Sequence, residues 1–285
     1  MNTSVKAYAK INLALNVYDR KEDGYHNIDM VTIPLDLHDI IELELLPKGY
    51  ESYITSDDDS LPTDESNLSN KAFRKMKEKF HIDKNVLIHI YKRIPMCAGL
   101  GGGSADAAAV INATLKAIKL KPSQDDLISL ASSIGADVSF CLYNKPARCR
   151  GIGEKLDFIT LKKRYHVLLI KPNEGVSTAL AYQTFDELET KPQLSNIERL
   201  IEGLKIGDEK IIAEEMKNSL QECAIKIVPE IKNIIDTLKK DGFPLTMMSG
   251  SGSTVFCMSL NHHAILEEYK KFSKLNYTVI VTQTL

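Results

Sequence analysis

The sequence predicts a protein of two domains that mixes strands with helices, and three observations carry this prediction. The chain has 285 residues, a length more typical of two domains than of one. Strand patterns dominate its first third, whereas helix patterns dominate after Asp157. We place the domain boundary near Lys162, which gives an N-terminal domain of residues 1–162 and a C-terminal domain of residues 163–285.

The first third contains the clearest strand patterns. Residues 9–18 alternate between a polar face and an apolar face, and the apolar face holds Ile11, Leu13, Leu15 and Val17. The dipeptide Asp23-Gly24 predicts a turn. Further strands are expected at residues 27–37 and 40–46, followed by a polar, acidic loop and a helix at residues 70–80.

A strand at residues 86–94 leads directly into the glycine-rich segment PMCAGLGGGSADAAA, residues 95–109. Small and apolar residues then recur at helical spacing, which predicts a helix with Ser104 as its N-cap. Another helix is expected at residues 124–134.

The second half reads mostly as helix. The pattern predicts helices at residues 178–188, 196–204, 209–227, 230–240 and 263–272. Strands are predicted at residues 166–170, 254–259 and 277–282.

Composition excludes several classes of protein. The formal net charge is −2, from 36 basic and 38 acidic residues, which argues against a nucleic-acid partner. No apolar run is long enough to span a bilayer, and the N-terminus lacks the layout of a signal peptide. Five scattered cysteines form no CxxC pair and are typical of buried thiols in a reducing compartment. We therefore expect a soluble cytoplasmic protein without a membrane partner.

The glycines at positions 99, 101, 102 and 103 need a reason, because glycine loses more backbone entropy on folding than any other residue. A glycine loop between a strand and a helix lets an anion approach the helix N-terminus, where the dipole favours negative charge. The segment lacks the Gly-Lys-Ser/Thr of a Walker loop, and Ser104 stands where a dinucleotide fingerprint has its third glycine. The alternative interpretation is a plain strand-to-helix turn. The negative charge of Asp106, in the first turn of the helix, also opposes a bound anion unless its side chain points away from the helix N-terminus. We interpret the segment as a phosphate-binding loop.

A lysine and an aspartate elsewhere supply what phosphoryl transfer requires. Lys10 and Asn12 share the polar face of the first strand, and Asp137 lies in the segment GADVSF. Taken alone, Lys10 fits an outward-facing lysine, and Asp137 fits a helix or turn cap equally well. Beside a phosphate loop, an acid can accept a hydroxyl proton while a cation steadies the transferring charge.

Two further segments are candidates for ligand binding. The segment MSGSGSTVF, residues 248–256, is a second glycine-rich stretch that can line the same cleft. Tyr25 and His26 follow the predicted turn, where an aromatic ring and an imidazole can bind a planar base by stacking and hydrogen bonding. A structural hairpin tip is the alternative interpretation of this pair.

These motifs resemble those of the GHMP kinase superfamily, which includes galactokinase, homoserine kinase, mevalonate kinase and phosphomevalonate kinase. The first glycine segment resembles the phosphate-binding motif of the superfamily, and MSGSGSTVF resembles its C-terminal glycine motif. The order of AKINLAL, DGYH, NLSNKAF, GADVSFCLY and GxGE resembles one branch in particular. That branch phosphorylates the 2-hydroxyl of a cytidine diphosphate-linked polyol in the non-mevalonate route to isoprenoid precursors.

The resemblance implies a role for each matching residue. Asp137 becomes the general base, with Lys10 beside it and the γ-phosphate. The substrate-binding residues are Asn12 near the reacting hydroxyl and, around the cytosine, Tyr25, His26 and Tyr182. The ATP-binding residues are Asn67, Lys92, Pro95, Gly99, Leu100, Gly101, Gly102, Gly103 and Ser104.

The resemblance also implies an α+β fold, the two-domain GHMP kinase fold. Its N-terminal domain resembles domain 2 of ribosomal protein S5, its C-terminal domain is ferredoxin-like, and the site lies in the cleft between them. The cofactor implied is ATP with Mg²⁺ carried by the nucleotide, without metal ligands from the protein. The partners implied are ATP and a small-molecule substrate, with no nucleic acid.

Three alternatives remain at this point. The chain can be another GHMP small-molecule kinase of the homoserine or mevalonate type, or a non-catalytic nucleotide-binding relative. An RNA-binding module is suggested only by the S5-like domain, and the missing basic excess argues against it.

Overall fold

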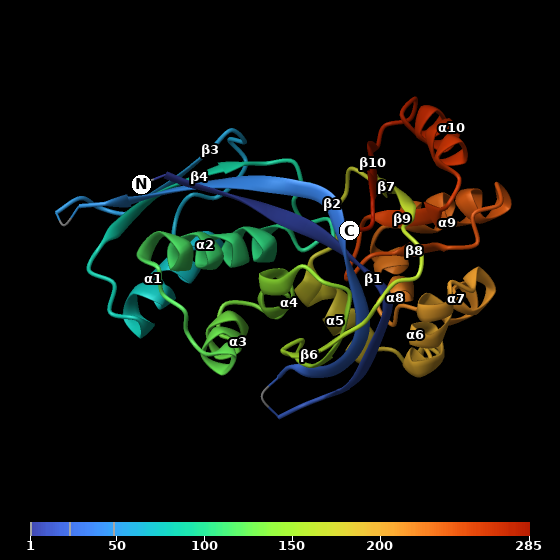
Figure 1. Cartoon of the computed structure of the whole chain (residues 1–285). Coiled ribbons are helices and arrows are strands. Elements are labelled where there is room, and N and C mark those ends of the chain that lie inside the picture. The colour runs from blue at the N-terminus through green and yellow to red at the C-terminus, as the bar shows by residue number, and fades with distance from the viewer. Residues whose placement is uncertain (1, 23, 48) are drawn as a thin grey trace. The chain divides into compact units, whose positions relative to one another are not determined.

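The computed structural model describes residues 2–22, 24–47 and 49–285 (Figure 1). Packing divides these residues into two compact units. Of the described residues, the first unit holds 2–9, 37–47, 49–96 and 101–144. The second unit holds 10–22, 24–36, 97–100 and 145–285. Each unit is therefore assembled from separate stretches of chain, and the division near Lys162 stays a prediction.

Two long strands, β1 (Asn2–Arg20) and β2 (His26–Leu46), run through both units and pair with each other. The sequence predicts two strands where β2 is one, and that prediction is wrong because Asp39 does not interrupt the strand. Its side chain is fully buried and accepts hydrogen bonds from a neighbouring segment. The predicted turn falls partly on Asp23, which lies outside the described residues.

In the first unit, the C-terminal part of β2 pairs antiparallel with β4 (Asn85–Tyr91), and β3 (Tyr53–Ser56) pairs parallel with β4. Alternate residues of β4 are buried, as its sequence pattern predicts. The helices of this unit are α1 (Leu68–Lys79), α2 (Gly102–Ile118), α3 (Gln124–Ser132) and α4 (Val138–Tyr143). Alanines line α2 on its buried side, so α1 and α4 pack closely against it (Figure 1).

In the second unit, the N-terminal part of β2 pairs with β5 (Ala147–Gly151), which pairs in turn with β6 (Lys155–Phe158). A separate antiparallel sheet has the order β10-β7-β9-β8. Its strands are β7 (His166–Lys171), β8 (Thr246–Met248), β9 (Val255–Ser259) and β10 (Thr278–Gln283). The helices are α5 (Thr178–Asp186), α6 (Ile197–Ile206), α7 (Glu209–Glu215), α8 (Gln221–Ile227), α9 (Glu230–Lys240) and α10 (His262–Phe272).

The helix predicted over residues 209–227 is two helices, α7 and α8. The residues between them leave the helix because their backbone pairs with β1: Leu15 N–H donates to the Lys217 carbonyl, and Ser219 N–H donates to the Leu15 carbonyl. Asn218, between these two, donates its amide to the carbonyls of Met248 and Gly250. A tertiary contact therefore overrides a continuous helical pattern.

Candidate active site

The two glycine-rich segments meet in the second unit. Gly99 has a φ of 69°, and a Cβ there would lie 2.2 Å from the carbonyl oxygen of Ser249, so no other residue fits. The Ser249 hydroxyl donates a hydrogen bond of 2.9 Å to the carbonyl of Gly99. This part of the first glycine segment is therefore fixed by packing against the second.

Lys10 and Asn12 lie beside this contact on β1, and both are buried. The Lys10 backbone N–H donates to the carbonyl of Leu100 at 3.0 Å, and its Nζ donates to Asn12 Oδ1 at 2.8 Å. Thr32 Oγ1 accepts from the Asn12 amide at 2.9 Å and so orients it. A Cβ on Gly250 would lie 3.2 Å from Lys10 Nζ. The interpretation of Lys10 as an outward-facing lysine is therefore wrong.

The second half of the first glycine segment opens α2 in the first unit. The N-cap is Gly101, with φ 70° and ψ 19°, and it offers no side chain to the amides of the first turn. The prediction that Ser104 caps this helix is wrong, because the glycine backbone turns into the helix earlier. Gly103 is exposed, while a Cβ on Gly102 would meet Ile94 at 3.1 Å. The helix therefore presents uncapped amides at an open N-terminus, an arrangement that favours an anion.

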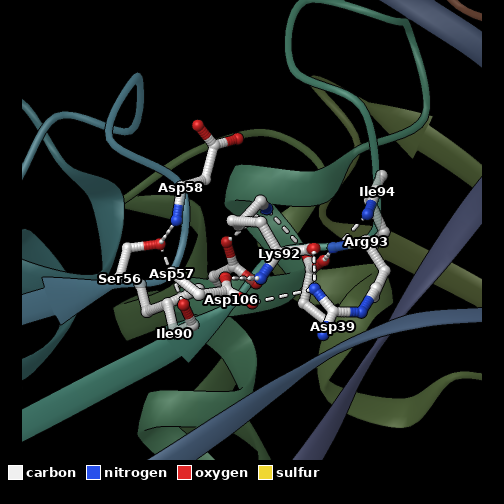
Figure 2. A network of polar contacts seen from close by, with 9 residues as sticks. All are labelled: Asp39, Ser56, Asp57, Asp58, Ile90, Lys92, Arg93, Ile94 and Asp106. Atoms are coloured by element: carbon white, nitrogen blue, oxygen red, sulfur yellow. Dashed lines mark hydrogen bonds and ion pairs between the residues drawn. The ribbon is translucent and has the colours of Figure 1, made fainter.

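Asp106 does point away from this N-terminus, into a buried ion-pair network (Figure 2). Lys92 Nζ lies 2.5 Å from Asp39 Oδ2 and 2.9 Å from Asp106 Oδ2. Burial raises the pKa of Asp106 to about 7, an effect that Lys92 partly offsets and the charge of Asp39 adds to. Burial lowers the pKa of Lys92, but the carboxylates of Asp106 and Asp39 outweigh burial and raise it. The carboxylate of Asp106, which is expected from the sequence to oppose an anion unless it points away, is therefore paired with Lys92.

Asp39 also fixes the backbone that leads into the glycine segment. Its Oδ1 accepts from the backbone N–H of Arg93 at 2.5 Å and of Ile94 at 2.8 Å. Pro95, half-buried, follows directly. Asp57 accepts from the Lys92 backbone N–H at 2.7 Å (Figure 2). The end of β4 is therefore held by two carboxylates before the glycines begin.

Asp137 occupies the N-cap position of α4, but its side chain makes no capping hydrogen bond. The interpretation of Asp137 as a helix cap is therefore wrong for α4. The segment that carries it lies next to the glycine helix, since a Cβ on Gly135 would be 3.9 Å from the Ser104 hydroxyl and also 3.9 Å from Leu68. The first unit thus brings the GADVSF segment and Ser104 together.

Asn67 is the N-cap of α1. Its Oδ1 accepts from the Ser69 N–H at 2.8 Å, and its amide nitrogen donates to the Pro62 carbonyl at 2.6 Å. The side chain is therefore occupied by the loop and the helix, and its proximity to a nucleotide stays a prediction.

The residues predicted to bind a base divide into one exposed ring and one packed cluster. Tyr25 is 63% exposed. His26 is buried, and its ring lies 5.0 Å from the ring of Tyr182, tilted by 35°. Phe185 meets the same imidazole edge-on at 6.0 Å between centroids. The structure therefore places Tyr182 beside His26, as the binding prediction requires.

Sequence reasoning missed three polar residues that hold the predicted ones in place: Asp39, Thr32 and Asp186. Asp186 Oδ1 lies 2.7 Å from His26 Nε2. Asp186 has a signal in the sequence, because it follows Tyr182 by four residues and therefore shares its helix face. Thr32 lies inside a predicted strand and Asp39 lies between two predicted strands, and nothing local marks either residue as part of the site.

The comparisons with known proteins match these features. Residues 67–145 match the GHMP kinases N terminal domain, and residues 200–277 match the GHMP kinases C terminal domain. No helix in the described part of the chain combines the length and hydropathy needed to cross a membrane.

Curated relatives are similar over their full length. A 4-diphosphocytidyl-2-C-methyl-D-erythritol kinase of Clostridium acetobutylicum is 36% identical over 283 residues, covering 99% of this chain and 100% of its own. The protein of that name from Clostridium beijerinckii is 39% identical and covers 99% of both chains.

Solved structures agree on the fold. A crystal structure of 4-(cytidine 5'-diphospho)-2C-methyl-D-erythritol kinase has a TM-score of 0.79 at 30% identity and covers 99% of both chains. A homoserine kinase from Cytophaga hutchinsonii also reaches a TM-score of 0.79, but at 21% identity, over 100% of this chain and 94% of its own. The predicted two-domain GHMP kinase fold is therefore confirmed.

Proposed function

The chain belongs to the GHMP kinases and, within them, to the 4-diphosphocytidyl-2-C-methyl-D-erythritol kinases, and on this premise we propose its reaction and the roles of its residues. The substrate oxygen of the 2-hydroxyl attacks the γ-phosphorus of ATP, the bond to the β,γ-bridging oxygen breaks, and ADP leaves. The product feeds the non-mevalonate route to isoprenoid precursors. The observation that supports this choice of substrate is the 36–41% sequence identity to relatives named 4-diphosphocytidyl-2-C-methyl-D-erythritol kinase.

The nucleotide is assigned to the N-terminus of α2. Gly101, Gly102, Gly103 and Ser104 offer backbone amides there, and Gly101 brings no side chain to compete for them. Lys92 lies close behind, since its Nζ would be 3.5 Å from a Cβ on Gly102. We propose that Mg²⁺ enters with the nucleotide, as the resemblance to the GHMP kinases implies.

We assign to Asp137 the role of accepting the proton of the substrate hydroxyl. We assign to Lys10 the role of stabilising the negative charge of the phosphoryl group that is transferred. A carboxylate can accept the hydroxyl proton as the new bond forms. Lys10, buried and held by Asn12, supplies a positive charge whose position needs no rearrangement during the reaction. These two assignments separate the proposal from a non-catalytic relative, which has no use for the acid.

The cytosine is assigned to His26, with Tyr25 and Tyr182 as the stacking rings. Asn12 is assigned to the substrate near the reacting hydroxyl, where Thr32 fixes its amide. Because homoserine kinase has the same fold, the fold alone does not distinguish a cytidyl substrate from homoserine. The aromatic rings packed around His26 are the feature that supports binding of a nucleobase.

A substrate panel tests the function. Release of ADP is measured with 4-diphosphocytidyl-2-C-methyl-D-erythritol, homoserine and mevalonate as separate acceptors. We expect turnover with the cytidyl compound alone. Turnover with homoserine or mevalonate instead would keep the GHMP kinase fold and discard the proposed substrate.

Replacement of the acid tests the mechanism. We expect Asp137→Asn to lower kcat about 10²–10⁴-fold, the usual contribution of general acid–base catalysis. Asp125→Asn, an exposed aspartate in the first turn of α3, is the matched control and should leave kcat unchanged. Unchanged turnover in Asp137→Asn would remove Asp137 from the role of base.

A further inference from the structure

His26 and Asp186 form a contact that none of the assignments above explains. Asp186 ends α5 and His26 begins β2, and their Nε2 and Oδ1 atoms lie 2.7 Å apart. The imidazole is 5% exposed and the carboxylate 30%. The aspartate therefore approaches a buried ring at one nitrogen only.

A carboxylate determines which ring nitrogen carries the proton. An ionised carboxylate only accepts hydrogen bonds, so Nε2 must carry the hydrogen that it donates to Asp186. In the neutral ring, Nδ1 then carries no hydrogen and is an acceptor. Asp186 in this way selects one tautomer of His26.

The groups around the carboxylate are cations and rings. Arg20 lies 3.8 Å from Asp186 Oδ2, and Lys191 donates to the backbone carbonyl of Asp186 at 3.3 Å. Tyr182 and Phe185 flank the imidazole and restrict its rotation. Together the rings fix the plane of His26, and Asp186 fixes its orientation within that plane.

We propose that Asp186 is a positioning residue that makes His26 select cytosine over uracil, an inference that rests on the proposed function. The acceptor Nδ1 can pair with the 4-amino group of cytosine, which is a donor. Uracil has a carbonyl oxygen at the same position, and two acceptors do not pair. Without Asp186 the ring can turn over or carry its proton on Nδ1, and the distinction is lost.

The tautomer is tested first in the unsubstituted protein, without substrate. In ¹⁵N-labelled protein, the imidazole nitrogens of His26 should show the Nε2–H tautomer, and this signature should change in Asp186→Ala. Asp186→Asn keeps an oxygen acceptor and should retain most of the Nε2–H form. A ring protonated at Nδ1 in the unsubstituted protein would overturn the inference.

Selectivity is tested next with the cytidyl substrate and its analogue in which uracil replaces cytosine. We expect kcat/KM to favour cytosine about tenfold to a hundredfold, the usual discrimination of a specific base contact. In Asp186→Ala, the logarithm of this preference should fall by at least half, while the KM for ATP and the melting temperature stay unchanged. The separate variant Asp186→Asn should keep most of the preference. Glu187→Gln, the next residue and exposed, is the matched control and should keep the full preference.

Two failures are distinguishable in this design. If the unsubstituted protein does not phosphorylate the cytidyl compound, the proposed function is wrong, and the cytosine selection falls with it whatever the tautomer. If the unsubstituted protein is active and Asp186→Ala keeps the preference for cytosine, only the role of Asp186 is wrong.

Discussion

Two clusters of paired charges in this chain differ in burial and in charge balance. In the first unit, Lys92 contacts both Asp39 and Asp106, and all three side chains are buried. In the second unit, Asp186 faces His26 and also neighbours Arg20, and it is partly open to solvent. The first cluster therefore has more acids than cations, whereas the second has a single acid among basic groups.

The difference indicates different duties. Separating the buried ion pairs of the Lys92 cluster would leave charges without a partner and without solvent, which costs much free energy. The cluster is therefore suited to holding the backbone in place. In the His26 cluster the imidazole is buried, but the Asp186 carboxylate is 30% exposed, so solvent stabilises its charge. We expect substitutions in the first cluster to change stability and substitutions in the second to change recognition.

The largest effect is expected from Lys92→Met. The substitution leaves Asp39 and Asp106 buried without a cation, and we expect the free energy of unfolding to fall by about 3–5 kcal/mol. Urea unfolding at about pH 7 measures it. Arg93→Gln is the control, because the Arg93 side chain is 59% exposed and should leave the unfolding midpoint unchanged. Equal midpoints in both variants would mean that the buried cluster does not hold the fold.

The next effect is a dependence on pH. The pKa of Asp106 is raised by burial from 3.8 to about 7, so between these values the folded protein holds a proton that the unfolded chain has released. Stability from this group is complete at low pH and is lost as the pH rises toward 7, with a slope of at most about 1.4 kcal/mol per pH unit. Asp106→Asn should lack this loss, and unfolding measured at about pH 5 and about pH 8 shows it. Parallel pH dependences in both proteins would contradict the prediction.

The smallest effect is expected from His26→Ala, and it should appear in binding rather than in stability. We expect the KM for the cytidyl substrate to rise about tenfold to a hundredfold through the lost base contact, with the KM for ATP unchanged. Steady-state kinetics with each substrate varied in turn measure both constants. An equal rise in both would place His26 outside the cytosine site.

The sequence predicted the parts of the site that local chemistry marks. Three features stand out within their own segments: the cluster of glycines before α2, the polar residues on one face of β1, and the aromatic pair Tyr25-His26 directly after a turn. Their alternatives were decided only by structure: burial removed the outward-facing interpretation of Lys10, and the missing capping bond removed the helix-cap interpretation of Asp137.

The residues that sequence reasoning missed act through partners far along the chain. Asp39 lies within β2 and makes its bonds to residues more than 50 positions later. Asp186 reaches His26 across 160 positions. The split between α7 and α8 has the same origin, because β1 supplies hydrogen bonds that compete with the helix. No periodicity within one segment records such contacts.

The pairing of β1 with the segment between α7 and α8 has a consequence for synthesis on the ribosome. The Val17 N–H donates to the hydroxyl of Ser219, 202 residues later, and Leu15 bonds to the backbone on either side of Asn218. Although β2 pairs with β1 soon after it in the chain, the contacts of β1 with residues 217–219 form only after most of the chain has been translated. Contacts of such long range slow folding and leave strand edges open in the meantime. The part of β1 around Leu15 and Val17 therefore reaches its full set of backbone contacts only once translation has passed residue 219.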